Sequence, residues 1–475
     1  MDKTDRSTNT GRVGRGKPLT ERSGNQLVAR FDPYVGLTVL FLAVALICGG
    51  SSASPISAVI VRVCAVPVLA LAVWRMILRG PGAGAIWPLL LLAAAAGVIL
   101  VQLIPLPPEL WGRLPGHASA VQAYAAAGLA APWLPINMTP WAGWDAFLGL
   151  IPPAAMLSAV LTIGIDGRRA LAVAVLGVAA VSVALGVLQV IGGMESPLRF
   201  YAVTNPKSAV GFFANRNHQA DFLAVTLPLA AYLATRWAGR GKSRGIFWGA
   251  AAAAYALVIA VGAAVTGSRA GVLLVLLGGA GAVVVAVRTR SRSPGGRWRL
   301  ASLAAPAALL LLGAGIVAIA VDAPLRDAVQ ARAGPDLRFS LNPQAAQAGA
   351  VFAPFGSGAG SFSTVYQMFE PVGELGPAFV NHAHDDFVET WLEAGWAGVF
   401  LIAGFLAWWV TASWKRMVDR RGRGAALSLA GSTIVGMMAI HSLVDYPLRT
   451  PALAALFALA CGLIVRPASQ RGRET

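Results

Sequence analysis

The chain contains little charge and little cysteine for its length. Only 12% of its 475 residues are charged, about half the share found in soluble globular proteins, which argues against a soluble fold. Its three cysteines, Cys48, Cys64 and Cys461, all lie in or beside apolar stretches. That placement excludes a disulfide framework and a cysteine metal site. No internal sequence repeat is visible.

Apolar residues are abundant, at 56% of the chain, and they fall into long runs. A helix needs about 20 such residues to cross a bilayer. We therefore predict an all-α integral membrane protein with about twelve transmembrane helices. The predicted spans lie near residues 35–52, 57–77, 87–105, 146–163, 170–190, 219–235, 246–266, 270–287, 300–320, 398–414, 425–443 and 451–466.

The net charge of +17 is unevenly placed along the chain. If the amino terminus is cytoplasmic and the spans alternate, most of the 38 Lys and Arg residues fall in cytoplasmic segments. This is the positive-inside pattern of membrane proteins, and it predicts that both termini are cytoplasmic. The basic runs lack interleaved aromatic residues, so no nucleic-acid partner is expected.

The same alternation divides the chain into segments. We expect residues 1–32 to form a disordered cytoplasmic tail, because they are polar and rich in Gly, Ser and Arg. Residues 33–320 hold spans one to nine, and residues 398–466 hold spans ten to twelve, followed by a cytoplasmic tail at 467–475. Between them, residues 321–397 form one large periplasmic loop, because a basic cluster flanks it on each side.

Two short outer segments carry cations that run against the positive-inside tendency. Residues 211–221 place Arg216 and Asn217 at the start of a predicted helix, where backbone donors and the helix dipole favour an anion. Residues 266–271 are so short a connection that Arg269 is held at the membrane face, where its guanidinium can bind a phosphate. An N-cap with a snorkelling Arg, and a turn facing lipid headgroups, are the alternatives.

The long loop carries the densest group of titratable residues. It holds Arg338, a Gly-rich turn at 356–362, and the cluster His382, His384, Asp385 and Asp386. His384 is a candidate general base oriented by a carboxylate. The paired histidines with the aspartates are also suitable metal ligands, and a structural role is the third possibility. The Gly-rich turn is expected to be a flexible turn, because no Lys follows as in a phosphate-binding P-loop.

The order of these motifs resembles the O-antigen ligase and O-antigen polymerase superfamily of bacterial inner-membrane glycosyltransferases. The motifs run in the order Gly-Phe-x-x-Asn-x-Asn, Ser-Arg-Ala-Gly, Gly-x-Gly-x-x-Ser-Phe, His-Asp-Asp-Phe, Glu-x-Gly-x-x-Gly and His-Ser-x-x-Asp. They occupy residues 211–217, 268–271, 358–362, 384–387, 393–398 and 441–445. The resemblance covers roughly residues 200–450. The chain departs from the commonest pattern in having Asp385 where Asn usually follows the histidine.

The resemblance implies a metal-independent glycosyl transfer at the periplasmic face, with no cofactor. The donor would be a glycan on undecaprenyl pyrophosphate, and the acceptor lipid A core or another glycan. His384 would be the base, with Asp385 and Asp386 beside it. Pyrophosphate would be held by Arg269 first, then by Arg216, Arg338 and Asn217, with Glu393 and His441 in supporting positions.

Two functional alternatives stay open on the sequence alone. These motifs do not separate a ligase from a polymerase, although a ligase is favoured. A transporter or flippase would place charges near the middle of the membrane, whereas the predicted span centres carry almost none.

Overall fold

A computed structural model describes residues 32–82, 84–239, 241–290, 338–374, 379–418 and 424–467. Within these residues the regular structure is helical, and extended pairing is limited to two isolated bridges. The first half comprises α1 (Pro33–Cys48), α2 (Pro55–Arg79), α3 (Ile86–Gln102), α4 (Pro108–Trp111), α5 (Ala118–Ala126), α6 (Pro140–Gly149), α7 (Ile151–Thr162) and α8 (Ile165–Ile191). The rest comprises α9 (Arg216–Ala224), α10 (Thr226–Ala238), α11 (Lys242–Val265), α12 (Arg269–Arg290), α15 (Arg338–Phe352), α16 (Phe362–Tyr366), η1 (Val372–Glu374), α17 (Asp386–Val418), α18 (Ala425–His441), η2 (Pro447–Arg449) and α19 (Pro451–Ile464).

The apolar stretches that predicted membrane spans form helices wherever the structure describes them. Six helical segments are long and apolar enough to cross a membrane, and α1, α3, α18 and α19 are shorter apolar helices. The predicted span at 300–320 lies outside the described residues, so the total of twelve stays a prediction. Two of the predicted spans each contain two consecutive helices, which meet at Leu150 (α6 and α7) and at Val225 (α9 and α10), and the backbone at both junctions stays in the helical region.

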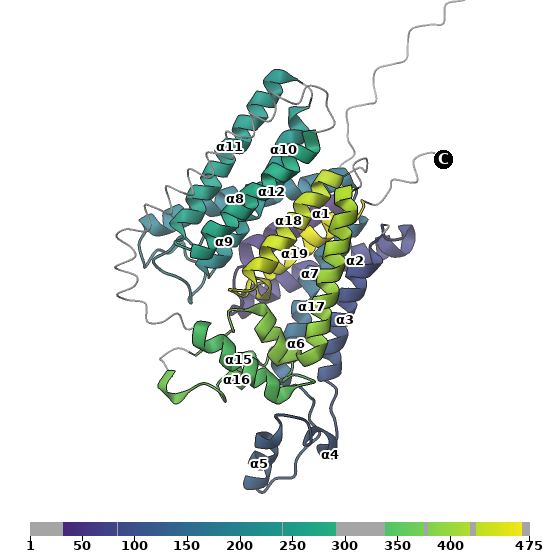
Figure 1. The fold of residues 1–475 in the computed structure, drawn as a ribbon, viewed down its shortest axis with the longest axis vertical. Helices are drawn as coiled ribbons and strands as arrows, with labels where there is room; N and C mark the ends of the chain where they lie inside the picture. Colours follow the sequence, from purple (N-terminus) through teal and green to yellow (C-terminus); the bar gives the residue numbers. More distant parts are fainter. Residues whose placement is uncertain are drawn as a thin grey trace, which may run out of the picture.

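The helices form two packed groups in Figure 1. One group holds α9 to α12, in which α10 packs against both α11 and α12. The other holds α1, α2, α7, α18 and α19, in which α7 packs against α2 and α19. A single large hydrophobic core runs through both groups, and α18 joins them because it packs against α12 as well as α19.

Basic residues gather at one end of this bundle. Arg75, at the end of α2, pairs with Asp32 at 3.0 Å just before α1. Arg168, at the start of α8, donates to Val465 O at 2.7 Å, just after α19. Arg416, at the end of α17, donates to Ile464 O at 2.9 Å. These contacts place the start of α1 and α8 beside the end of α2, α17 and α19, as alternating spans require.

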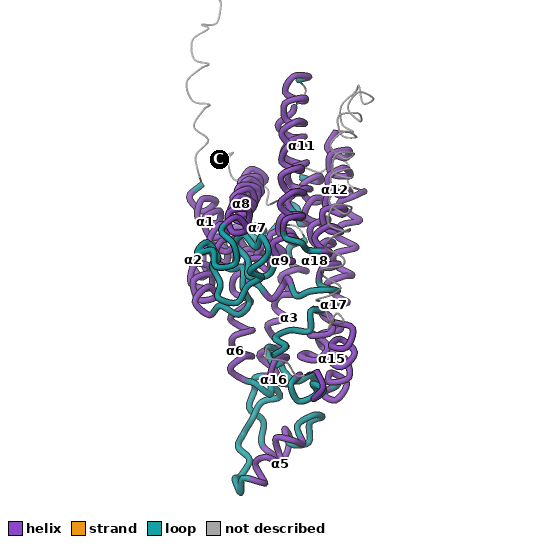
Figure 2. Tube along the Cα trace, turned by 90° about the vertical axis from the view of Figure 1, so that its left-hand side faces the viewer, coloured by secondary structure: helices purple, strands orange, loops and turns teal. Residues whose placement is uncertain are grey.

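The segments that the sequence predicts to face outward fold at the opposite end of the molecule. Figures 1 and 2 both show α15 and α16 there, with α5 beyond them. A second, smaller hydrophobic core holds this part together, with Leu341, Phe352, Phe362 and Tyr366 among its buried members. The described part of the long loop is therefore a packed unit.

Helix α17 connects the two ends. Its 33 residues correspond to about 50 Å, whereas the hydrocarbon core of a bilayer is about 30 Å thick. The helix is kinked at Gly395, whose φ of 54° and ψ of −140° are not helical. The predicted span at 398–414 follows this kink. The helical turns before the kink, from Asp386 to Glu393, contain the acidic residues of α17.

Candidate active site

His384 lies in the last turn of the outer loop, immediately before α17. Its φ of 53° makes it the one residue other than glycine with a positive φ in the described part of the chain. Its Nδ1 lies 3.1 Å from Asp445 Oδ1, and its side chain is 30% exposed. A carboxylate partner at Nδ1 favours the tautomer in which Nδ1 carries the proton, so Nε2 is left as a proton acceptor.

Asp445 is fully buried in the turn between α18 and η2, and several donors surround it. Its Oδ2 accepts hydrogen bonds from Asn217 Nδ2 at 2.7 Å and from Asn215 Nδ2 at 3.4 Å. Burial alone would raise the pKa of Asp445, but the hydrogen bond from His384 and the nearby His218 hold that pKa well below its ordinary value. Asp445 is therefore an anion that orients the His384 ring.

Further titratable residues extend inward from Asp445. His218 Nε2 lies 3.8 Å from Asp445 Oδ1, and His441 Nε2 lies 4.0 Å from Asp445 Oδ2. On its other side, His441 Nδ1 lies 3.0 Å from Asp221 Oδ2, without the alignment of a hydrogen bond. All three side chains are buried. His441, predicted as a supporting residue, thus lies between Asp221 and Asp445, further inside the protein than the partly exposed His384.

Asp385 is the N-cap of α17. Its Oδ1 accepts hydrogen bonds from the backbone N–H groups of Phe387 at 2.9 Å and Val388 at 3.1 Å. Asn and Asp are about equally good N-cap residues. The cap therefore gives a physical reason why Asp can stand at a position where the resemblance more often has Asn, and it engages this carboxylate with the backbone of α17.

Asp386 and Glu393 belong to an acidic group around Arg449. Arg449 Nη1 lies 2.8 Å from Glu393 Oε2 and 3.4 Å from Glu389 Oε1, and its Nε lies 3.4 Å from Asp386 Oδ1. Ser442 Oγ also donates to Asp386 Oδ2 at 2.8 Å. These contacts tie the start of α17 to the turn that carries Asp445, so Asp386 and Glu393 brace the site.

The Gly-rich turn is packed against the kink of α17. The backbone N–H groups of Ser357 and Gly358 donate to Leu392 O and Glu393 O, each at 2.9 Å. A Cβ at Gly395 would lie 2.3 Å from Pro354 O, so a side chain there would collide with the turn. The expectation of a flexible turn was therefore wrong, because these carbonyls and the missing side chain fix the turn in place.

Arg216 and Arg269 are the first residues of neighbouring helices. Asn215 caps α9 by accepting from Asn217 N at 2.8 Å, and Ser268 Oγ accepts from Gly271 N at 3.0 Å at the start of α12. A Cβ at Gly271 would lie 2.5 Å from Ala220 Cβ, so this glycine lets the two helices approach closely. A Cβ at Gly267 would lie 3.7 Å from Arg216 Nη1, so Arg216 reaches the loop before Arg269.

The two arginine side chains are both exposed at this outer end. Two helix N-termini and two guanidinium groups together make a site suited to a polyanion. Asn217 differs from them, since its amide donates to Asp445, and its predicted role toward pyrophosphate stays untested. Arg338 begins α15, and its side chain lies outside the described residues.

His382 is engaged at both ring nitrogens. Nδ1 lies 2.9 Å from Glu389 Oε1, and Nε2 lies 3.3 Å from Ser52 Oγ. The Tyr446 ring packs against it with centroids 4.1 Å apart, and against His384 with centroids 4.9 Å apart. His382 and His384 therefore have separate partners, and no group of three or more His, Cys, Asp or Glu side chains arranged to hold a metal occurs within the described ranges.

The structure adds residues that the sequence reasoning did not select. Asp445 was visible within the motif at 441–445, but its contact with His384 spans 61 positions of sequence. Arg449 was visible only as a cation on the outer side. Glu389 was visible on the polar face of the predicted helix, four residues before Glu393. Asp221 and Tyr446 were not selected, because only the packing of α9 and α18 brings them to the site.

Comparison with known protein families matches residues 254–403 to a family described as O-antigen ligase. The matched segment runs from within α11 to within α17, and it includes Arg269, the Gly-rich turn and His384. This match confirms the resemblance predicted from the motifs, and with the apolar helices it supports a multi-pass enzyme of the bacterial inner membrane. No curated protein matches the chain.

Proposed function

We propose that the protein is an O-antigen ligase-type glycosyltransferase. It transfers a glycan from undecaprenyl pyrophosphate to a hydroxyl group of lipid A core, or of a similar acceptor, at the periplasmic face. The observation that carries the proposal is the contact of the partly exposed His384 with the buried Asp445, at 3.1 Å. A histidine oriented by a buried anion is a suitable base for a sugar hydroxyl near neutral pH.

In the proposed reaction the acceptor hydroxyl gives its proton to His384 Nε2 while its oxygen attacks the anomeric carbon of the donor. The bond between that carbon and the pyrophosphate oxygen breaks, and undecaprenyl pyrophosphate leaves as an anion. Asp445 stabilises the imidazolium that forms, since it accepts the hydrogen bond from Nδ1. The proton is returned to solvent when the product leaves.

Arg216 and Arg269 bind the pyrophosphate in this proposal, with Arg338 as a further ligand. The first two are exposed at the adjoining N-termini of α9 and α12, where negative charge is favoured. A lipid-anchored donor is already confined to the membrane surface, so binding the leaving group is enough to set its position. These contacts stabilise the charge that develops as the bond breaks.

The lipopolysaccharide profile of a deletion strain tests the transfer reaction. A ligase predicts that capped core disappears on the gel while lipid-linked polymer accumulates. A core that still carries a single repeat would identify a polymerase of the same superfamily. An unchanged profile would overturn both, and would direct attention to another surface polysaccharide.

The proposed chemistry needs no metal, and a chelator tests this with purified protein. EDTA should leave transfer from undecaprenyl pyrophosphate at its original rate, because His384 and the arginines supply the base and the electrophilic groups. Loss of activity that a divalent cation restores would instead make His382 and His384 ligands, and the base would have to be sought elsewhere.

A further inference from the structure

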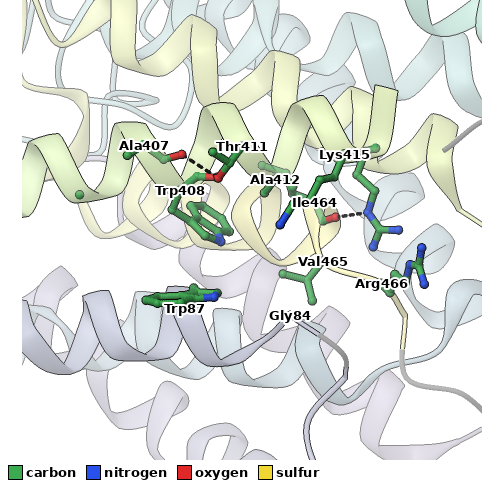
Figure 3. A pocket seen from close by; sticks show the side chains of 12 residues that line it. Gly84, Trp87, Ala407, Trp408, Thr411, Ala412, Lys415, Ile464, Val465 and Arg466 are labelled. Atoms are coloured by element: carbon green, nitrogen blue, oxygen red, sulfur yellow. Dashed lines mark hydrogen bonds between the residues drawn. The ribbon is translucent and has the colours of Figure 1, made fainter. Parts of the chain in front are cut away.

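A cavity of about 540 Å³ lies at the end of the molecule opposite the candidate active site. It opens between α3, the last turns of α17 and the end of α19, as Figure 3 shows. The acidic residues near His384 are at the start of α17, so the length of that helix separates the two places. The cavity is therefore independent of the proposed transfer site.

The polar part of the cavity is cationic. Lys415, Arg416 and Arg466 line it, and none of the lining residues is acidic. Arg416 also donates from Nε to Ile464 O at 2.9 Å, which holds its guanidinium at the end of α19. An anionic group with several oxygen acceptors is the ligand that such a group of cations favours.

The remainder of the cavity is apolar and aromatic. Trp87 on α3 lies across from Trp408 on α17 in Figure 3, and Ala407 and Ala412 lie on the same side as Trp408. Trp87 is 62% exposed, which is typical of a tryptophan at a membrane interface. A free anion would make no favourable contact with the apolar side chains, whereas an anion attached to an acyl chain would contact both the cations and the apolar side chains.

We propose that this cavity binds an acidic phospholipid. The phosphate contacts Lys415 and Arg466, with Arg416 beside them, and the upper part of an acyl chain lies against Trp87 and Trp408. Basic cavities between helices at the cytoplasmic side of membrane proteins suit anionic headgroups in this way. The proposal concerns the end of the molecule where Arg75, Arg168 and Arg416 gather, and it does not depend on the identity of the transferred glycan.

Native mass spectrometry of the full chain in detergent tests the site with phosphatidylglycerol as the probe. The double variant Lys415→Gln/Arg466→Gln should bind this lipid roughly thirtyfold more weakly, because each cation near an anionic headgroup contributes about fivefold. The matched control is Arg79→Gln/Arg244→Gln, which removes two exposed cations from the ends of α2 and α11 outside the cavity. The control should bind as the unaltered protein does.

Two further arms separate a lipid site from other anion binding. Phosphatidylcholine should bind weakly and equally to all three proteins, and inorganic phosphate at millimolar concentration should not displace phosphatidylglycerol. Quenching of tryptophan fluorescence by brominated phosphatidylglycerol should fall in Trp87→Leu, which reports the acyl chain. Equal binding by the double variant and the control, or displacement by phosphate alone, would overturn the proposal.

Discussion

The backbone of His384 is held in a conformation that residues with a side chain rarely adopt. A left-handed φ at such a residue costs about 1–3 kcal/mol, which neighbouring contacts must offset. On one side Glu389 Oε2 accepts from Ala383 N at 2.9 Å, and on the other Asp385 caps α17. The ring is therefore directed toward Asp445 by contacts on both sides, which suits a group whose orientation matters for proton transfer.

The two loop histidines should differ sharply when each is removed. We expect His384→Ala to lower transfer by about 10²–10⁴-fold, because general-base catalysis is lost. His382→Ala should lower it less, since that ring contacts Glu389 and Ser52. Rates are measured with purified proteins at matched concentration, and thermal unfolding shows whether each variant is folded. Similar rates for both variants would refute the assignment.

Asp445→Asn should separate orientation from charge. The amide can keep a hydrogen bond to His384 but supplies no negative charge, so we expect a loss of at least about 100-fold in transfer rate. Asn217→Ala is the matched comparison, because it removes a donor to Asp445 and leaves the carboxylate in place. A rate for Asp445→Asn close to that of the unaltered enzyme would make Asp445 a structural residue only.

Arg269 should be sensitive to the shape of its side chain as well as to its charge. Arg269→Ala loses a charged hydrogen bond worth about 1.5–3 kcal/mol, which corresponds to roughly ten- to a hundredfold in transfer rate. Arg269→Lys should also be impaired, because an ammonium group lacks the planar fork. Arg113→Ala, another outer-side arginine outside the site, serves as the control. Transfer at the original rate in Arg269→Ala would make this residue a headgroup contact.

The sequence singled out His384, Arg216 and Arg269 as candidates because each lies within a short motif, and their roles stay predictions. It did not predict what Asp385 does, since a cap and a catalytic carboxylate look alike until the helix start is known. Nor did it predict Arg449 as a brace, because its three carboxylate partners lie 56 to 63 positions earlier in the chain. Such contacts depend on how the turn after α18 docks on α17.

At the scale of elements, the apolar helices were predictable because hydropathy is a local property of the chain. The kink within α17 was less predictable from the sequence. The kink in α17 depends on Gly395 and on the carbonyl of Pro354, which belongs to another segment. The predicted position of span ten nevertheless agrees with the part of α17 that follows the kink, because apolar residues become dense there.

Arg168 joins three helix ends and should be important for stability. It is buried, and its guanidinium donates to Ile163 O at 3.2 Å, Val465 O at 2.7 Å and Val160 O at 2.9 Å. Arg168→Leu would leave these carbonyl groups without a donor, at a cost of about 2–4 kcal/mol. We expect a lower midpoint of thermal unfolding in detergent, compared with Arg244→Leu at an exposed position. Equal midpoints would contradict this role.

For the whole molecule, the gathering of cations at one end predicts which end is cytoplasmic. Gln347→Cys, at an exposed position of α15, should react with a membrane-impermeant maleimide in intact spheroplasts. Ser243→Cys, at the other end, should react only after lysis. Ala345→Cys is buried in the small outer core and controls for access, so it should react little in either state. The reverse pattern would invert the topology and refute the proposed site.

The position of Asp445 in the chain also bears on biogenesis. Arg216, Arg269 and His384 are all synthesised before it, and the anion that orients His384 arrives only with the turn between α18 and α19. In the proposed mechanism, a nascent chain that lacks this turn therefore presents its cationic helix ends without an oriented base. The mechanism predicts that transfer begins only after α18 and the turn that follows it have been inserted.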